Sequence, residues 1–247
     1  MTMTRELMVE RPGGVLYGVL YLPERAERPL PAVVCSHFFG GTADDSGELA
    51  QALAERGVAA YAFDFAGGSR KSRSTGVSTL ENSVRTEAED LSCVLDVVRG
   101  LPEVDPDRTF LLGQSQGGFV SSMVADARPA DVAGLFLLYP AFLIHEEMLD
   151  RFGSPDQVPE TFIQWHRLGR AYATDAMAYD PYEHMGYPGP VRIWHGDQDA
   201  MVPLGYARRA AKTYPDATLE VVPGAGHAFY DEDQNRIADE IAHIVLG

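Results

Sequence analysis

The sequence contains little cysteine and little positive charge. Only two cysteines, Cys35 and Cys93, occur among 247 residues, and Cys35 lies in an apolar run typical of a buried strand. A disulfide framework is therefore not expected, and a reducing, cytoplasmic compartment is. Lys and Arg number 20 against 36 Asp and Glu, which gives a net charge of −16. That balance leaves too little positive charge for nucleic acid or an anionic membrane as a partner.

Long apolar runs are also lacking. The first residues, MTMTREL, carry no apolar signal-peptide core. No run approaches the ~20 residues that a membrane-spanning helix needs, so no membrane partner is expected. The length and the ordinary hydrophobic content of 45% suit one α/β domain.

Short apolar runs alternate with segments of helical periodicity along most of the chain. Continuous apolar runs predict buried strands at residues 32–36, 58–63, 109–112, 134–138, 191–194 and 218–222. Helical spacing predicts helices at 46–56, 80–99, 119–125, 204–214 and 232–246. Two further strands, at 7–10 and 15–22, are expected around the turn R-P-G-G. The alternation predicts an α/β fold with a doubly wound, mostly parallel sheet.

Residues 141–190 interrupt this rhythm. They are rich in Met, aromatic and charged residues, with helical fragments predicted at 145–151 and 162–173. Because the next strand comes unusually late, we interpret the segment as a lid inserted over one edge of the sheet. The core domain then consists of residues 1–140 and 191–247.

The motif G-Q-S-Q-G-G at residues 113–118 lies between a predicted strand and a predicted helix. A G-x-S-x-G in that position is a nucleophile elbow, in which the serine adopts a strained backbone conformation. Gly113 and Gly117 are needed because side chains there would collide with the neighbouring strand and helix. The turn places the Ser115 hydroxyl at a helix N-terminus, where N–H groups stabilise an oxyanion. An ordinary Gly/Ser turn is the alternative.

A serine nucleophile needs a base, and the base needs a carboxylate to orient it. In this fold class both groups follow strands, in the chain order serine, acid, histidine. His227 follows the last predicted strand, and we predict it as the base rather than as a surface histidine. Asp197 and Asp199 both follow the preceding strand. Asp199 is preferred as the acid because it lies further into the loop, whereas Asp197 is expected to fix the turn.

Two backbone N–H groups are expected to hold the oxyanion. The first belongs to Gln116, directly after the nucleophile, and the second comes from the loop H-F-F-G-G at residues 37–41. His37 could itself be catalytic. A structural role for His37 is preferred, because His227 supplies the base.

These residues together resemble the α/β-hydrolase family over nearly the whole chain, and within it the bacterial cinnamoyl (feruloyl) esterases. The elbow is similar to that group's G-H-S-Q-G-G, and residues 64–69 resemble its D-F-x-G-x-G-x-S segment. Residues 195–203 match H-G-x-x-D-x-x-V-P, whose second acid is catalytic, which implies Asp199. H-F-F-G-G is similar to H-G-F-x-G and implies the Phe39 backbone as the second oxyanion donor. Phe38 stands where the group has glycine, and Gln114 where it has histidine.

The predicted lid is similar to the lid of the same esterases. D-Q-V-P at 156–159 and L-G-R-A-Y at 168–172 resemble D-x-I-P and L-G-G-F-Y. The resemblance implies that Tyr172 helps to hold the phenolic ring of the substrate; packing inside the lid is the alternative. Trp165 and Phe38 are the other residues expected to contact substrate.

The sequence therefore predicts a serine carboxylic-ester hydrolase that acts through an acyl-enzyme on hydroxycinnamoyl or similar aromatic acyl esters. A general short-chain carboxylesterase is the nearest alternative, followed by a serine peptidase or acyltransferase on the same fold. A non-catalytic binding protein of this fold is the remaining class. No cofactor is expected, and no metal, because His145, Glu146 and Glu147 diverge around a helix. The expected partner is a small-molecule ester, and a homodimer is compatible with the sequence.

Overall fold

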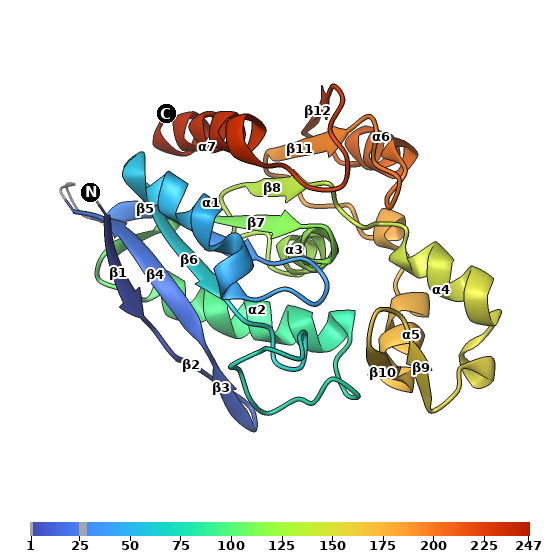
Figure 1. Ribbon diagram of the computed structural model, residues 1–247. Helices are drawn as coiled ribbons and strands as arrows, with labels where there is room; N and C mark the ends of the chain where they lie inside the picture. Colours follow the sequence, from blue (N-terminus) through green and yellow to red (C-terminus); the bar gives the residue numbers. More distant parts are fainter. Residues whose placement is uncertain (1, 25–28) are drawn as a thin grey trace.

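The core of the fold is an eight-stranded sheet with the order β1-β4-β6-β5-β7-β8-β11-β12 in the computed structural model, which describes residues 2–24 and 29–247 (Figure 1). The strands are β1 (Thr2–Glu6), β4 (Gly18–Pro23), β6 (Ala59–Phe63), β5 (Leu30–Ser36), β7 (Val104–Gln114), β8 (Leu135–Leu138), β11 (Val191–Gly196) and β12 (Ala217–Val222). β1 and β4 pair antiparallel, β4 pairs antiparallel with β6, and all pairings from β6 to β12 are parallel. The predicted mostly parallel, doubly wound sheet is confirmed.

Helices cover both faces of this sheet. One face carries α1 (Ala43–Glu55) and α7 (Asp231–Leu246); the other carries α2 (Val84–Arg99), α3 (Gln116–Ala127) and α6 (Leu204–Thr213). Val33 and Cys35 of β5 pack in the core under α1 and α7, and Val34 packs in the core under α2, α3 and α6, because successive strand residues point to opposite faces. Every residue of β5 and β6 is buried, which accounts for their continuous apolar sequence.

The N-terminal strands differ from the prediction. The strand expected at residues 7–10 is replaced by β1, which starts at Thr2, and by β2 (Val9–Arg11), which pairs with β3 (Gly14–Leu16). β1 lies at the edge of the sheet with mostly exposed side chains, and it is held to β4 by backbone pairing. Its polar sequence therefore has no apolar alternation by which it could be recognised.

Two other elements, β7 and α2, begin at residues other than those predicted. β7 begins at Val104, five residues before the strand predicted at 109–112, so the segment D-P-D-R at 105–108 lies inside the strand, where the register with β5 shifts between Leu30 and Ala32. α2 begins at Val84 instead of residue 80, because Ser83 forms its N-cap. Ser83 Oγ accepts from Thr86 N (3.3 Å), and Thr86 Oγ1 accepts from Ser83 N (2.9 Å).

The segment 141–190 lies beyond the carboxyl ends of β7 and β8 (Figure 1). Its elements are α4 (Ile144–Phe152), η1 (Pro155–Gln157), β9 (Thr161–Ile163), β10 (Arg167–Gly169), α5 (Arg170–Met177) and η2 (Pro181–Glu183). The helix predicted at 162–173 is wrong in its first half, which forms the β9–β10 hairpin. Phe162 and Leu168 are paired across that hairpin and buried, whereas Ile163 is exposed. In the described part of the chain, no helix has the length and apolar character needed to cross a membrane.

Candidate active site

The elbow lies between β7 and α3, and Ser115 occupies it with φ 52° and ψ −115°. This positive φ is a strained conformation for a residue other than glycine. A Cβ on Gly113 would lie 2.2 Å from Gly117 O, and one on Gly117 would lie 2.3 Å from Ser36 O. Both glycines are therefore required by close backbone approach, as the sequence predicted. The approach of Gly117 to Ser36 also brings the end of β5, and the loop after it, against the elbow.

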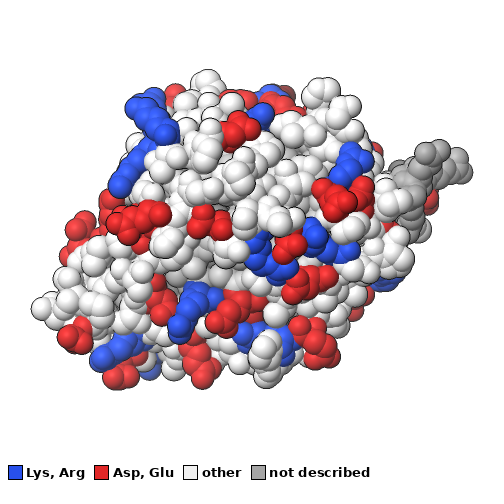
Figure 2. Space-filling view, turned by 180° about the vertical axis from the view of Figure 1, so that it is seen from behind, with Lys and Arg blue, Asp and Glu red and all other residues white. Residues whose placement is uncertain are grey.

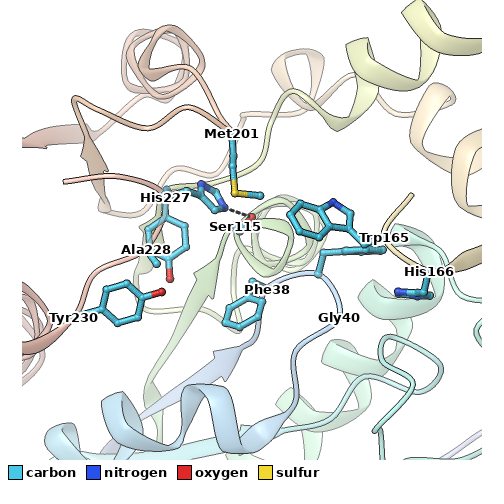
Figure 3. Close-up of a pocket in the computed structure, with 11 residues that line it drawn as sticks. Phe38, Gly40, Ser115, Trp165, His166, Met201, His227, Ala228 and Tyr230 are labelled. Atoms are coloured by element: carbon cyan, nitrogen blue, oxygen red, sulfur yellow. Dashed lines mark hydrogen bonds between the residues drawn. The ribbon is translucent and has the colours of Figure 1, made fainter. Parts of the chain in front are cut away.

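Ser115, His227 and Asp199 are brought together at the carboxyl edge of the sheet. Figure 3 shows the contact between Ser115 and His227. His227 Nε2 lies 2.9 Å from Ser115 Oγ, and His227 Nδ1 lies 2.7 Å from Asp199 Oδ2. Because a carboxylate can only accept, Nδ1 donates to Asp199, and Nε2 is free to accept from the serine hydroxyl. This arrangement can remove the proton from Ser115 Oγ.

The Asp199 carboxylate is fully buried and accepts from four donors. Its Oδ1 accepts from the N–H groups of Met201 (2.9 Å) and Val202 (2.8 Å), and its Oδ2 contacts His227 and His195. Burial alone would raise the pKa of Asp199, but the hydrogen bonds from His195, His227 and Val202 N outweigh it and hold the pKa well below its ordinary range. The carboxylate therefore stays charged beside the imidazole.

Asp197, the other candidate acid, lies away from His227 in the same loop. Its Oδ1 accepts from Gly224 N (2.7 Å), which ties the loop after β11 to the loop after β12. The interpretation of Asp197 as a turn-fixing residue agrees with this contact.

His195 is a residue that sequence reasoning did not single out. It is the last residue but one of β11 and has no exposed surface, and its Nε2 lies 2.8 Å from Val202 O and 3.2 Å from Asp199 Oδ2. It therefore fixes both the backbone and the carboxylate of the acid loop. The sequence signal that could have found it is the histidine of H-G-D-Q-D, which directly follows the strand predicted at 191–194.

His37 braces the loop of residues 37–41 from inside. Its Nε2 accepts from Phe65 N (3.2 Å), so its Nδ1 carries the proton and donates to Phe38 O (2.7 Å). Burial lowers the pKa of His37, which favours this neutral form. These contacts agree with the structural interpretation of His37. They hold the loop that contains Phe39, the residue expected to hold the oxyanion together with Gln116.

Two cavities meet at Ser115. The larger has a volume of about 420 Å³, and the smaller about 230 Å³. Both are lined by Phe39, Ser115, Trp165, Met201 and His227. The larger lobe is completed by Phe38, Gly40, Tyr139, His166, Ala228 and Tyr230 (Figure 3). The smaller lobe is completed by Gln116, Ala141, Leu143, Ile144, Glu147, Gln164, Tyr172 and Val202.

The residues expected to contact substrate differ in what their side chains are free to do. Phe38 and Trp165 line the larger lobe, and Trp165 is 75% exposed at its mouth. Tyr172 lines the smaller lobe but is only 3% exposed, and its hydroxyl donates to Gln116 Oε1 at 2.6 Å. The described residues contain no group of three or more His, Cys, Asp or Glu side chains placed to hold a metal ion.

Comparison with known proteins finds relatives in sequence and solved structures of similar fold. Protein Rv2307c of Mycobacterium tuberculosis is 28% identical over 226 residues, which cover 90% of this chain and 72% of its own. The monoglyceride lipase of Rattus norvegicus is 32% identical over 120 residues, which cover 48% of this chain and 38% of the lipase. Among solved structures, Est1E from Butyrivibrio proteoclasticus with bound ferulic acid has a TM-score of 0.87 at 24% identity, covering 97% of this chain and 98% of Est1E.

The likeness to Est1E confirms the predicted α/β-hydrolase fold. Residues 27–188 match the family model Hydrolase_4, described as serine aminopeptidase, S33. That stretch contains the elbow and ends before the acid and histidine loops. The chain belongs to this hydrolase family.

Proposed function

We propose that the chain is a serine carboxylesterase that acts through an acyl-enzyme on aromatic acyl esters of the hydroxycinnamoyl type. The observation that carries this proposal is the hydrogen-bonded series Ser115–His227–Asp199 at the junction of two cavities with aromatic walls. Such a series activates a serine hydroxyl, which is a poor nucleophile alone.

The reaction takes two steps. His227 Nε2 accepts the Ser115 proton as Oγ attacks the ester carbonyl, and the N–H groups of Gln116 and Phe39 stabilise the tetrahedral oxyanion. His227 then gives the proton to the departing alcohol, which leaves an acyl group on Ser115. In the second step a water loses its proton to His227 and attacks the acyl carbonyl, and the acid departs as Ser115 is restored. The Asp199 carboxylate stabilises the imidazolium in both steps.

The two lobes divide the substrate between them. The alcohol must leave next to His227, and the residues that follow His227, Ala228 and Tyr230, line only the larger lobe. We assign the alcohol to that lobe and the acyl group to the smaller one. The smaller lobe is lined largely by residues of the 141–190 segment, which acts as the lid. A planar aromatic acyl group suits the apolar and aromatic side chains there.

The family description raises a second candidate, an aminopeptidase. The acyl group of such a substrate carries an α-ammonium, and Glu147 supplies a carboxylate in the smaller lobe. The panel that tests the proposal therefore includes an amino-acid anilide.

The test is a hydrolysis panel of methyl ferulate, p-nitrophenyl acetate, butyrate and octanoate, and L-leucine p-nitroanilide. The proposal predicts a clear kcat/KM preference for methyl ferulate. Ser115→Ala should lower the turnover by at least about 10⁴-fold, because it removes the nucleophile. The matched control is Ser122→Ala, on the same helix, whose hydroxyl donates to Phe119 O (2.6 Å). It should leave turnover intact.

The other outcomes are distinct. Turnover of the p-nitrophenyl esters alone would keep the esterase and remove the aromatic preference. Preference for the anilide would replace the esterase with the aminopeptidase. Equal activity of wild type and Ser115→Ala would end the serine mechanism.

A further inference from the structure

The side chain of Gln116 lies in the middle of a buried hydrogen-bond chain. Tyr172 Oη donates to Gln116 Oε1 (2.6 Å), and Gln116 Nε2 donates to Glu87 Oε2 (2.8 Å). Asn82 Nδ2 donates to the other oxygen of Glu87, Oε1 (3.1 Å). The four side chains belong to residues no more than 3% exposed. The chain thus links α5, the elbow and α2 in the interior.

Glu87 sets the direction of this chain. In its ionised form the carboxylate can only accept, so it receives the amide N–H₂ groups of Gln116 and Asn82 and turns Gln116 Oε1 toward Tyr172. The pKa of Glu87 is raised to about 7, because burial and the nearby Asp90 carboxylate raise it by more than the hydrogen bonds from Gln116 and Asn82 lower it. Burial also raises the pKa of Tyr172 well above its ordinary value, so its hydroxyl remains a donor.

Tyr172 also contacts the other residue expected to hold the oxyanion. Its ring packs edge-on against Phe39, with the ring centroids 5.6 Å apart. The ring of Phe39 is also stacked on that of His166, with the ring centroids 5.0 Å apart and an interplanar angle of 8°. One buried tyrosine therefore touches the side chains of both Phe39 and Gln116.

We propose that Tyr172 is a positioning residue of the oxyanion hole, which acts through the Gln116–Glu87 chain and through the ring of Phe39. Because its hydroxyl proton is donated to Gln116, Tyr172 has no proton left to donate to the ring of the acyl group. The inference rests on the proposed esterase function. It also gives the 141–190 segment a second role, because Tyr172 of that segment helps to fix the site.

The expected effect follows from the sensitivity of such donors to position. Loss of one oxyanion donor costs ~10²–10³-fold in kcat, and a displacement of about 1 Å costs on the order of 10²-fold. A donor that is loosened but still present should cost about 10-fold. Because the oxyanion exists only in the transition state, the loss belongs in kcat while KM stays nearly constant.

The decisive variant is Tyr172→Phe, which removes the hydroxyl and keeps the ring against Phe39. We expect kcat to fall about 10-fold for both p-nitrophenyl acetate and methyl ferulate, with KM within about twofold. The matched control is Tyr187→Phe, which removes another buried hydroxyl, the donor to Val132 O at 2.7 Å. It should cost similar thermal stability and leave kcat unchanged.

A second variant tests the chain itself. Glu87→Gln places a donor where the carboxylate has only acceptors, so the Gln116 amide loses its fixed orientation. We expect a similar fall in kcat. The double variant should lose less than the product of the two single losses, because both residues act through Gln116. If the kcat loss of the double variant equals the product of the two single losses, Tyr172 and Glu87 do not act through the same hydrogen-bond chain.

Two results would contradict the proposal for Tyr172. A rise in KM confined to methyl ferulate would show that its hydroxyl binds the acyl ring instead. Equal kcat in wild type and Tyr172→Phe would remove the positioning role.

Inactivation by diethyl p-nitrophenyl phosphate separates this inference from the proposed function. The phosphoryl oxygen of that reagent occupies the oxyanion hole, so the inactivation rate should fall about 10-fold in Tyr172→Phe even if no ester in the panel is a good substrate. A wild-type chain that reacts neither with the esters nor with the phosphate would overturn both proposals.

Discussion

Asp197 and Asp199 show how two identical side chains two residues apart take different tasks. Asp199 is surrounded by four donors, two of them histidines, whereas Asp197 accepts from the backbone of Gly224. The difference arises because one carboxylate contacts Nδ1 of His227 and the other contacts the backbone of the loop after β12. Only the first can influence the charge on the imidazole.

Asp199→Asn should therefore lower kcat for p-nitrophenyl acetate by about 10³–10⁴-fold. An amide N–H₂ facing His227 Nδ1 favours the tautomer in which Nε2 is protonated and cannot accept from Ser115. Asp197→Asn is the control, since its amide oxygen can still accept from Gly224 N, and it should stay within a few-fold of wild type. Similar losses in both variants would assign the effect to the loop rather than to the carboxylate.

For single residues, the sequence predicts the position of a side chain that directly follows a strand. Ser115, Asp199 and His227 each follow a strand of a parallel sheet, so topology alone brings them to one edge. Tyr172 is different, because its hydroxyl meets Gln116 only after the 141–190 segment has packed on the sheet. Its partner is 56 residues away, and no local pattern encodes that contact.

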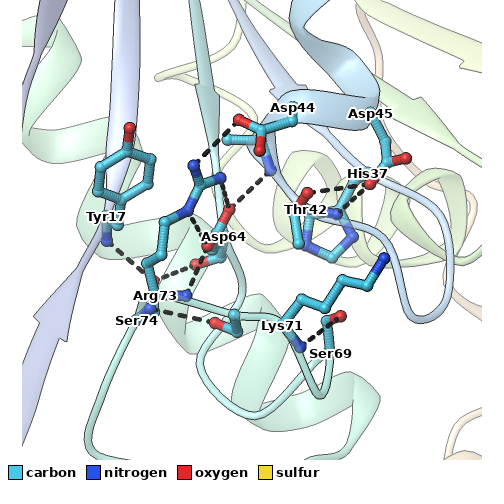
Figure 4. A network of polar contacts seen from close by, with 12 residues as sticks. Tyr17, His37, Thr42, Asp44, Asp45, Asp64, Ser69, Lys71, Arg73 and Ser74 are labelled. Carbon is cyan, nitrogen blue, oxygen red and sulfur yellow. Dashed lines mark hydrogen bonds and ion pairs between the residues drawn. The ribbon is translucent and has the colours of Figure 1, made fainter.

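Among the elements, the loop after β6 is tied to the start of α1 through one buried carboxylate (Figure 4). Asp64 Oδ1 accepts from Ala43 N (2.7 Å), at the first residue of α1. Arg73 contributes its backbone N–H (2.7 Å) and two guanidinium donors (2.9 and 3.0 Å) to the same side chain. Arg73 is the last residue of R-K-S-R at 70–73, a basic segment in an acidic protein, and the local sequence does not indicate its pairing with Asp64.

Arg73→Met should lower the free energy of unfolding by about 2 kcal/mol at pH 7. The value is below that for a fully buried pair because Arg73 is partly exposed, but Asp64 is left buried with an uncompensated charge. The control, Arg236→Met, breaks pairs with Glu220 and Glu240, in which all three side chains are about 40% exposed, and should cost less than ~1 kcal/mol. Urea unfolding measures both, and equal losses would contradict the role of Asp64.

The same pair has a defined pH dependence. Burial would raise the pKa of Asp64, but hydrogen bonds from Arg73 and from Ala43 N lower it further than burial raises it. A carboxyl with a lowered pKa stabilises the fold above its unfolded-state pKa of about 4, and this contribution disappears as the pH falls through the folded-state value. The difference between wild type and Arg73→Met should thus be full at pH 7 and shrink toward pH 3.

For the whole molecule, the net charge matters because its electrostatic field extends further than any direct contact. Figure 2 shows acidic and basic side chains interspersed on the face that it displays, so local fields there largely cancel. The excess of 16 negative charges remains as a diffuse field around the protein. Glu147 adds a carboxylate to the smaller lobe itself. An anionic substrate is therefore repelled both on approach and on binding.

This field predicts that only the charged member of a matched pair of esters responds to salt. Mono-p-nitrophenyl succinate carries a carboxylate and p-nitrophenyl butyrate does not, while their leaving groups are identical. Between about 10 mM and 1 M salt the Debye length falls from about 30 to about 3 Å, so repulsion of the succinate should be screened and its kcat/KM should rise several-fold. The butyrate, which has no net charge, should change little over the same range. A kcat/KM for the succinate that falls with salt would mean that the potential at the site mouth is positive, and that local cations outweigh the net charge of the chain.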